Sequence, residues 1–130
     1  MTDIDHIILK VNDLEQSLGF YTHVMGFEDA GYRDPFAIVR VNPGFILQLA
    51  PWGTDGYEHY AFSMSQAQFD AVFARIKDNE LEYGDAFDKV GTNAGPGVEA
   101  GAKGDAPTLY VYDPNKHLIE IRTYSSPDDV

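Results

Sequence analysis

The sequence predicts an α+β fold in which a strand, a helix and three further strands occur twice in succession. Two observations support this prediction. Apolar and polar residues alternate in short runs along the 130-residue chain, which is typical of strands with one buried face. Equivalent features also lie 53 residues apart, since His6 and His59 each begin a strand, and Asp13 and Gln66 each begin a helix. This spacing indicates an internal repeat of two similar modules.

In the first half, residues 4–11 alternate and are expected to form the opening strand. Asp13 is expected to cap a helix with Gln16 as its capping-box partner, and Gly26 is expected to end it. One apolar stripe should be buried along this helix, made of Leu14, Leu18, Tyr21 and Met25. Three strands should follow, over residues 28–32, 36–41 and 45–50.

The second half repeats this order of elements. A strand is expected over residues 59–64, and a capping box of Ser65 and Gln68 should begin a helix that ends at Asn79. The apolar stripe of this helix is Phe69, Val72, Phe73 and Ile76. Three strands are expected over residues 82–88, 108–112 and 118–124. We therefore expect one domain, with module one at 1–55, module two at 56–124 and a short C-terminal tail at 125–130.

The two halves differ in one stretch, residues 91–107. It contains five glycines and no apolar periodicity, so no regular element is expected there. A loop of this length inside a compact domain is usually functional or mobile. We expect either a loop that covers a ligand or a disordered surface loop.

Composition excludes several classes of function. The chain has no cysteine, which rules out disulfides, thiolate metal sites and a cysteine nucleophile. Its formal net charge of −12 would repel phosphate backbones and anionic membranes, so we expect neither nucleic acid nor membrane as a partner. The N-terminus shows no signal peptide and no apolar run is long enough to span a bilayer, so a cytoplasmic location is expected.

Four polar residues lie in the expected strands on the face opposite their apolar neighbours: His6, Gln48, His59 and Glu120. Each has apolar neighbours of the opposite parity, so each should point away from the helix-covered face of its sheet. Taken singly, such a residue more often packs or lies at the surface than binds a ligand. Together, two imidazoles and one carboxylate form the ligand set of a facial triad. That set suits Fe, Mn, Ni, Co or Zn as a divalent ion and leaves positions open for substrate.

Several motifs resemble the vicinal oxygen chelate superfamily: Asp5-His6-Ile7, the run from Asp13 through Tyr21 with Met25-Gly26-Phe27 after it, His59-Tyr-Ala-Phe, and Tyr112-Asp-Pro-Asn-Lys-His-Leu-Ile-Glu120-Ile. That superfamily includes glyoxalase I, fosfomycin-modifying transferases, extradiol ring-cleaving dioxygenases and bleomycin-binding proteins. The resemblance implies two βαβββ modules forming a cupped eight-stranded mixed sheet, with the helices outside. It also implies a homodimer, and a small substrate that chelates one divalent metal ion through vicinal oxygens. By position, His6, His59 and Glu120 match the metal ligands of the superfamily.

The chain departs from particular branches of that superfamily. Gln48 occupies the position of a metal-binding glutamate that serves as the base in glyoxalase I, and an amide cannot abstract a proton at neutral pH. Ile8 replaces a threonine that similar fosfomycin transferases carry. Tyr110 matches a tyrosine of the extradiol dioxygenases, but other branches share that tyrosine. Bleomycin binders usually lack the metal triad, which is complete here.

The leading hypothesis is a metal-dependent enzyme whose subclass stays open among lyase or isomerase, ring-cleaving dioxygenase and transferase. The candidate catalytic residues are Gln48, Tyr110 and Arg122. Tyr110 either lines the pocket or packs in the core, and Arg122 either holds an anionic substrate or pairs with a nearby carboxylate. The alternatives are a non-catalytic drug- or metabolite-binding resistance protein and a structural domain without a site.

Overall fold

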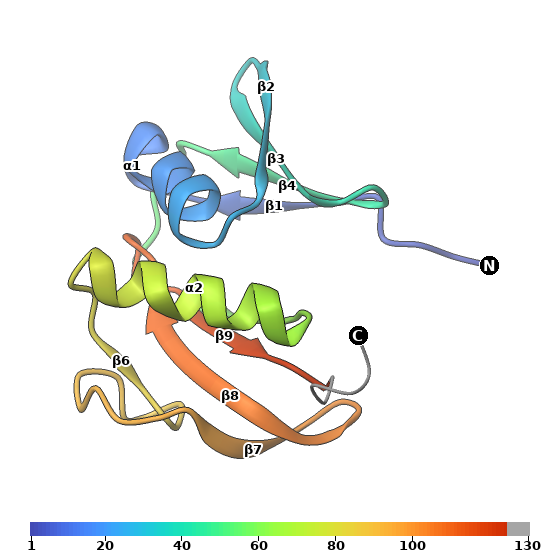
Figure 1. Ribbon diagram of the computed structural model, residues 1–130. Coiled ribbons are helices and arrows are strands. Elements are labelled where there is room, and N and C mark those ends of the chain that lie inside the picture. The colour runs from blue at the N-terminus through green and yellow to red at the C-terminus, as the bar shows by residue number, and fades with distance from the viewer. Residues whose placement is uncertain (125–130) are drawn as a thin grey trace. The chain divides into compact units, whose positions relative to one another are not determined.

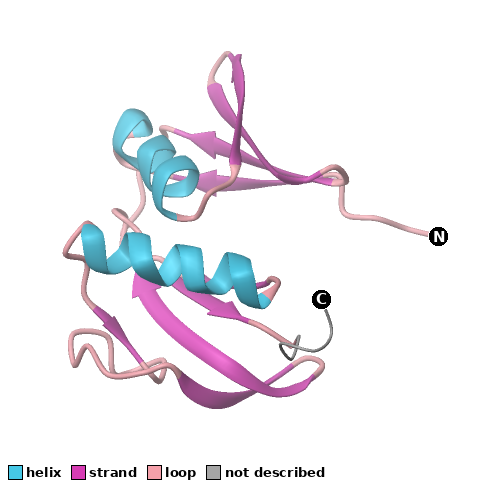
Figure 2. Ribbon diagram, in the orientation of Figure 1, coloured by secondary structure: helices cyan, strands magenta, loops and turns pink. Residues whose placement is uncertain are grey.

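The computed structural model describes residues 1–124 and divides the chain into two compact units, Met1–Gly56 and Tyr57–Val130 (Figure 1). Each unit contains one mixed sheet and one main helix, which confirms the α+β class and the repeated order of elements (Figure 2). That the units form one domain stays a prediction. The expected tail at 125–130 lies outside the described residues.

The first unit has a four-stranded sheet in the order β1-β4-β3-β2. Strand β1 runs parallel to β4, and the other neighbouring strands are antiparallel. The α-helix of this unit lies against one face of the sheet (Figure 1). The elements are β1 (His6–Lys10), α1 (Leu14–Gly19), the π-helical turn η1 (Phe20–Val24), β2 (Glu28–Arg33), β3 (Phe36–Asn42) and β4 (Phe45–Ala50).

The first helix begins at its predicted N-cap, but of the two hydrogen bonds of the expected capping box only one is present among the described residues, and the helix changes its winding halfway. The side chain of Asp13 accepts a hydrogen bond of 2.8 Å from the backbone N–H of Gln16, which confirms the N-cap. From Phe20 the helix becomes a π-helix, and Gly26, with a φ of 80°, follows its end. A π turn shifts the register by one residue. The predicted stripe is therefore only half right: Tyr21 and Met25 are buried with Ser17, Phe20 and Val24, whereas Leu14 and Leu18 are half-buried.

The second unit has a five-stranded sheet in the order β5-β9-β8-β6, with β7 also paired to β8. Strand β5 runs parallel to β9, and the other pairs are antiparallel. Helix α2 lies over one face of this sheet (Figure 1). The elements are β5 (His59–Ser63), α2 (Gln66–Asp78), β6 (Tyr83–Gly84), β7 (Gly97–Gly101), β8 (Gly104–Tyr112) and β9 (Leu118–Arg122).

The start and end of α2 follow the sequence prediction. Ser65 and Gln68 form both hydrogen bonds of a capping box, and Asn79 is the C-cap. Of the predicted stripe, Phe69, Val72 and Ile76 are fully buried. Phe73 is half-buried and packs edge-on against the ring of Tyr83 at 5.1 Å. Among the helices of residues 1–124, none is long and apolar enough to cross a membrane.

The edge of the second sheet differs from the prediction. The expected strand over residues 82–88 is reduced to Tyr83–Gly84, and the expected loop over residues 91–107 contains β7 and the start of β8, which form a hairpin. Strands β6 and β7 pair with different parts of β8 and together occupy the position that β2 has in the first unit. The eight predicted strand positions are therefore present, with one of them split by residues 85–96.

Glycine makes this split edge possible because other backbone approaches it closely. A Cβ at Gly84 would overlap the backbone carbonyl of Lys89, although nothing in the φ of Gly84 requires glycine. At Gly97 a Cβ would lie 2.8 Å from the backbone oxygen of Asp85. Glycine carries no apolar signal, which is why the sequence pattern did not predict strand pairing here.

Gly84→Ala should therefore destabilise the second unit. The added methyl group must displace backbone, and overpacking of this kind costs about 2 kcal/mol or more. Gly44→Ala is the matched control, since its Cβ would meet only the Asn42 side chain at 3.7 Å. Urea denaturation should show a lower free energy of unfolding for the first variant and a change within about 0.5 kcal/mol for the second. Equal stabilities would contradict the close packing at Gly84.

Candidate functional site

The strand registers relate the candidate residues of the two units. In the first unit β1 and β4 pair His6 with Ile46 and Ile8 with Gln48. In the second unit β5 and β9 pair His59 with Leu118 and Ala61 with Glu120. His6 therefore corresponds to His59, and Gln48 corresponds to Glu120. The repeat places an imidazole and an amide in one unit, and an imidazole and a carboxylate in the other.

The parity of residues along β5 and β9 places the side chains of His59, Glu120 and Arg122 on the sheet face opposite the helix. In β5 the side chains of Tyr60 and Phe62 are half-buried, while His59 and Ser63 are exposed. In β9 the fully buried Ile119 and Ile121 alternate with Glu120 and Arg122, as the parity of the sequence predicts. Glu120 and Arg122 are themselves buried, with exposed fractions of 6% and 3%. A carboxylate so little exposed needs compensation for its lost hydration.

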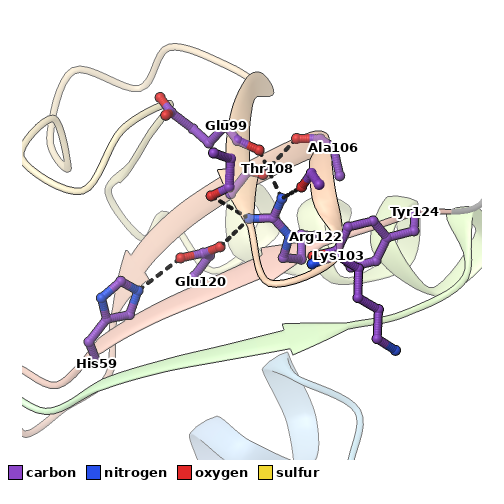
Figure 3. Close-up of polar contacts among 10 residues, drawn as sticks. His59, Glu99, Lys103, Ala106, Thr108, Glu120, Arg122 and Tyr124 are labelled. Atoms are coloured by element: carbon purple, nitrogen blue, oxygen red, sulfur yellow. Dashed lines mark hydrogen bonds and ion pairs between the residues drawn. The ribbon is translucent and has the colours of Figure 1, made fainter.

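Part of that compensation comes from His59. Its Nε2 lies 2.8 Å from Oε1 of Glu120 (Figure 3). Two ligand atoms about 2.1 Å from one ion and at right angles to each other are about 3 Å apart. The distance between these two atoms is thus close to that between two adjacent ligands of one divalent ion. Their chemistry, one imidazole nitrogen and one carboxylate oxygen, suits the borderline first-row metals.

Arg122 holds the other oxygen of Glu120. Its Nη1 donates to Oε2 of Glu120 at 2.6 Å, and the same guanidinium donates to the backbone oxygens of Glu99 at 2.8 Å and Gly104 at 3.0 Å (Figure 3). Burial opposes the charge of Arg122, but the hydrogen bond to Glu120 and the nearby Tyr124 raise its pKa above the ordinary value. The guanidinium is therefore charged, fixes the Glu120 carboxylate and ties it to the β7–β8 hairpin.

The hairpin approaches Arg122 so closely that only glycine fits at one position. A Cβ at Gly101 would overlap the guanidinium carbon of Arg122. The turn after Gly101 forms one wall of a cavity of about 420 Å³, whose other walls include His59, Ser63 and Glu120. At the rim, the backbone N–H of Lys103 donates to the hydroxyl of Tyr124 at 3.2 Å. The glycine-rich stretch thus lines the cavity of the candidate site, and its expected role of covering a ligand stays a prediction.

Tyr110 lies beside the same carboxylate. The β8–β9 register pairs Tyr110 with Glu120, and its ring meets the His59 ring edge-on at a centroid distance of 6.2 Å. Burial and the negative charge of Glu120 raise the pKa of Tyr110 to about 12. The phenol is therefore a neutral hydrogen-bond donor over the physiological pH range. Of the two roles considered for Tyr110, packing is clear from its burial, and it also contacts the candidate ligands.

The first unit has a separate cavity of about 300 Å³, lined by residues that include His6, Gln48, Arg33 and Arg40. Nδ1 of His6 lies 2.7 Å from a carboxylate oxygen of Asp5. When Nδ1–H donates to Asp5, the lone pair of Nε2 is free to bind a metal, and such an arrangement is common for metal-bound histidines. His6 and His59 therefore both offer Nε2 as the ligand atom.

The structure brings together four of the six predicted site residues: His59, Tyr110, Glu120 and Arg122. His6 and Gln48 share the cavity of the first unit. Within either unit, the described residues contain no group of three His, Asp or Glu side chains close enough to share an ion. The convergence of His6 with His59 and Glu120 therefore stays a prediction.

Some residues of the two cavities were not found from the sequence. Gly101 gives no signal by itself, because its importance depends on the distant Arg122. Arg40 could have been found, since it alternates with the buried Val39 in β3 and therefore shares the face of Gln48. Arg33 lies beyond an irregularity in the pairing of β2 with β3, where alternation is no longer a guide.

Comparisons with known proteins agree with the fold. A profile of the glyoxalase/bleomycin resistance protein/dioxygenase superfamily matches residues 3–121. The metallothiol transferase FosB of Shouchella clausii is 24% identical over 126 residues, covering 92% of this chain and 79% of the relative. Lactoylglutathione lyase of Escherichia coli O157:H7 is 31% identical over 135 residues, covering 89% and 88%. The solved structure of the oxidase ChaP-H2 has a TM-score of 0.78 and 27% identity, covering 97% of this chain and 96% of that one.

Gly101→Ala should separate the Arg122 guanidinium from its partners while leaving every charge in place. Loss of hydrogen bonds to a buried charge should lower the free energy of unfolding by about 3 kcal/mol. Relative to the wild-type protein, hydrogen exchange should also become faster in the β7–β8 hairpin. Exchange in β1–β4 should not change and serves as the internal control. Wild-type stability and wild-type hairpin protection would show that Arg122 does not hold the hairpin.

Proposed function

Since the chain belongs to the glyoxalase/bleomycin resistance protein/dioxygenase superfamily, we propose that it is a metal-dependent enzyme of the glyoxalase or dioxygenase type. Its substrate would be a small molecule that reaches the metal through two neighbouring oxygen atoms. The observation that carries this proposal is the pair formed by His59 and Glu120, whose donor atoms lie 2.8 Å apart at the wall of a cavity.

We assign the metal ligands to His6, His59 and Glu120. His59 and Glu120 belong to the second unit, and His6 supplies the third ligand from the first unit of the same chain or of a second chain in a homodimer. Two imidazoles and one carboxylate suit Fe, Mn, Ni, Co or Zn and leave coordination positions for a substrate. When bound, such an ion polarises a substrate oxygen on which negative charge develops.

The residues around the ligands have separate roles in this proposal. Arg122 orients the carboxylate of Glu120 through its hydrogen bond to Oε2, so that Oε1 faces His59. Tyr110 packs against His59 and limits the positions that its ring can adopt. Gln48 can donate or accept a hydrogen bond with substrate, but its amide cannot serve as a general base. The subclass stays open among lyase or isomerase, ring-cleaving dioxygenase and transferase.

A second candidate function is supported by Gln48 itself. The repeat places this amide where the second unit has Glu120, so the first unit has no carboxylate for proton abstraction at this strand position. A protein that binds a drug or metabolite without turnover would need no such base. Substrate panels separate the two functions: hemithioacetals with the Ni(II) or Co(II) protein and catechols with the anaerobic Fe(II) protein. Enzymatic function predicts turnover in at least one panel, and the binding function predicts none.

Purified protein should bind one Co(II) or Ni(II) ion per chain. His59→Ala should weaken binding by more than about 100-fold, which exceeds the loss of about 10–100-fold typical of a residue that only supports a ligand. His23→Ala is the matched control, because His23 is an exposed histidine of η1. Isothermal titration and the visible absorption of Co(II) measure both variants. Unchanged metal binding by His59→Ala would refute the ligand assignment.

A further inference from the structure

The positive charges of the first unit gather on one face of its sheet. Residues 1–56 contain eight Asp and Glu residues but only three cationic residues, Lys10, Arg33 and Arg40. Lys10 alternates in β1 with the buried Leu9 and shares the face of His6. Arg33 and Arg40 line the cavity of His6 and Gln48. In a chain with a net charge of −12, two of the three cationic residues of this unit thus line its candidate site, and the third lies on the same face of the sheet.

Both arginines retain donors for a ligand. Nη1 of Arg40 donates to Oε2 of Glu28 at 2.9 Å, which uses one of the five N–H groups of the guanidinium, and the Arg40 side chain is 42% exposed. No hydrogen bond or ion pair joins the Arg33 side chain to another of the described residues, and Arg33 is exposed. Asp5, whose carboxylate lines the cavity, is bonded to His6. Neither carboxylate therefore neutralises Arg33.

The second unit does not repeat this arrangement. By register, Arg40 corresponds to Tyr112 and Arg33 corresponds to Gly97. The second unit does have an arginine on its cavity wall, Arg122, but its guanidinium is buried and bonded to Glu120 and to the hairpin. Arginines with unused donors beside the cavity are thus a property of the first unit, whereas the candidate carboxylate ligand lies in the second.

We infer that the cavity of the first unit binds the oxyanionic group of a small molecule, a carboxylate or a phosphonate or phosphate, through Arg33 and Arg40. The planar fork of arginine matches the oxygen atoms of each of these groups, and the weak hydration of the guanidinium favours its pairing with an anion. This inference rests on the proposed function in one respect, because the oxyanion would be the group of the substrate that does not bind the metal. The binding site itself does not require a metal.

The test is an NMR titration of the metal-free protein at low ionic strength, with oxalate in one arm and inorganic phosphate in the other. Saturable shifts are expected at backbone amides of β2, β3 and β4 in at least one arm, and the tighter arm identifies the class of oxyanion. Arg33→Gln and Arg40→Gln should each weaken binding about tenfold, the loss expected for one charge-assisted hydrogen bond. Lys89→Gln should leave oxyanion binding unchanged, because Lys89 lies in the second unit and outside the two cavities.

Glu28→Gln should have the opposite effect on the affinity for the oxyanion. It removes a negative charge and releases Arg40 from its ion pair, so the oxyanion should bind about threefold more tightly, the scale of an exposed ion pair. All four side chains changed here are exposed or half-exposed, and the unchanged amide spectrum of each variant verifies its fold.

The outcomes separate this inference from the proposed function. Oxyanion binding that depends on Arg33 and Arg40 in a protein that binds no Co(II) would support the subsite and end the metal-dependent proposal. Co(II) binding without shifts in β2–β4 in either arm would support the metal-dependent proposal and overturn the inference of an oxyanion subsite. Shifts that persist in Arg33→Gln and Arg40→Gln, or that Lys89→Gln reduces equally, would overturn the inference and indicate general attraction to positive charge.

Discussion

The buried carboxylate of Glu120 constrains the candidate site of the second unit and the hairpin beside it. A charge with 6% exposure is stable only when hydrogen-bonded and paired, and Arg122 and His59 provide this on its two oxygens. Arg122 is buried in turn, and its Nη2 donates to two backbone oxygens of the β7–β8 hairpin, whereas its Nε has no hydrogen-bond partner among the described residues. The approach of the hairpin to Arg122 excludes a side chain at Gly101. One carboxylate therefore determines the position of a guanidinium, the packing of a hairpin and one wall of a cavity.

The repeat gives two sheets with matching registers but different chemistry. Where the second unit has Glu120, the first has the neutral Gln48, which needs no buried cation. The first unit accordingly has no equivalent of the contact between Arg122 and its hairpin among residues 1–56, and its arginines remain at the surface of its cavity. We interpret this as a division of roles, with the metal carboxylate in one unit and recognition of substrate charge in the other.

The sequence predicted most of this arrangement where alternation is regular. The faces of β1, β4, β5 and β9 follow from parity alone, and so do the positions of His59 and Glu120. Three features depended on contacts that no local pattern contains. The change of the first helix to a π turn shifted its buried stripe, the glycines of the split edge have no side-chain period, and Arg122 bonds backbone oxygens distant in sequence. Because the glycine-rich edge is split into β6 and β7, residues 1–124 contain nine strands where eight were expected.

Anomalous diffraction from crystals loaded with Co(II) would locate the metal ion and its ligands. One cobalt ion should be bound at about 2.0–2.2 Å by Nε2 of His59 and by a carboxylate oxygen of Glu120. Nε2 of His6, from the same or a second chain, should be the third protein ligand, and Arg122 should still donate to the other oxygen of Glu120. Cobalt bound elsewhere, with His59 and Glu120 still hydrogen-bonded to each other, would contradict the account.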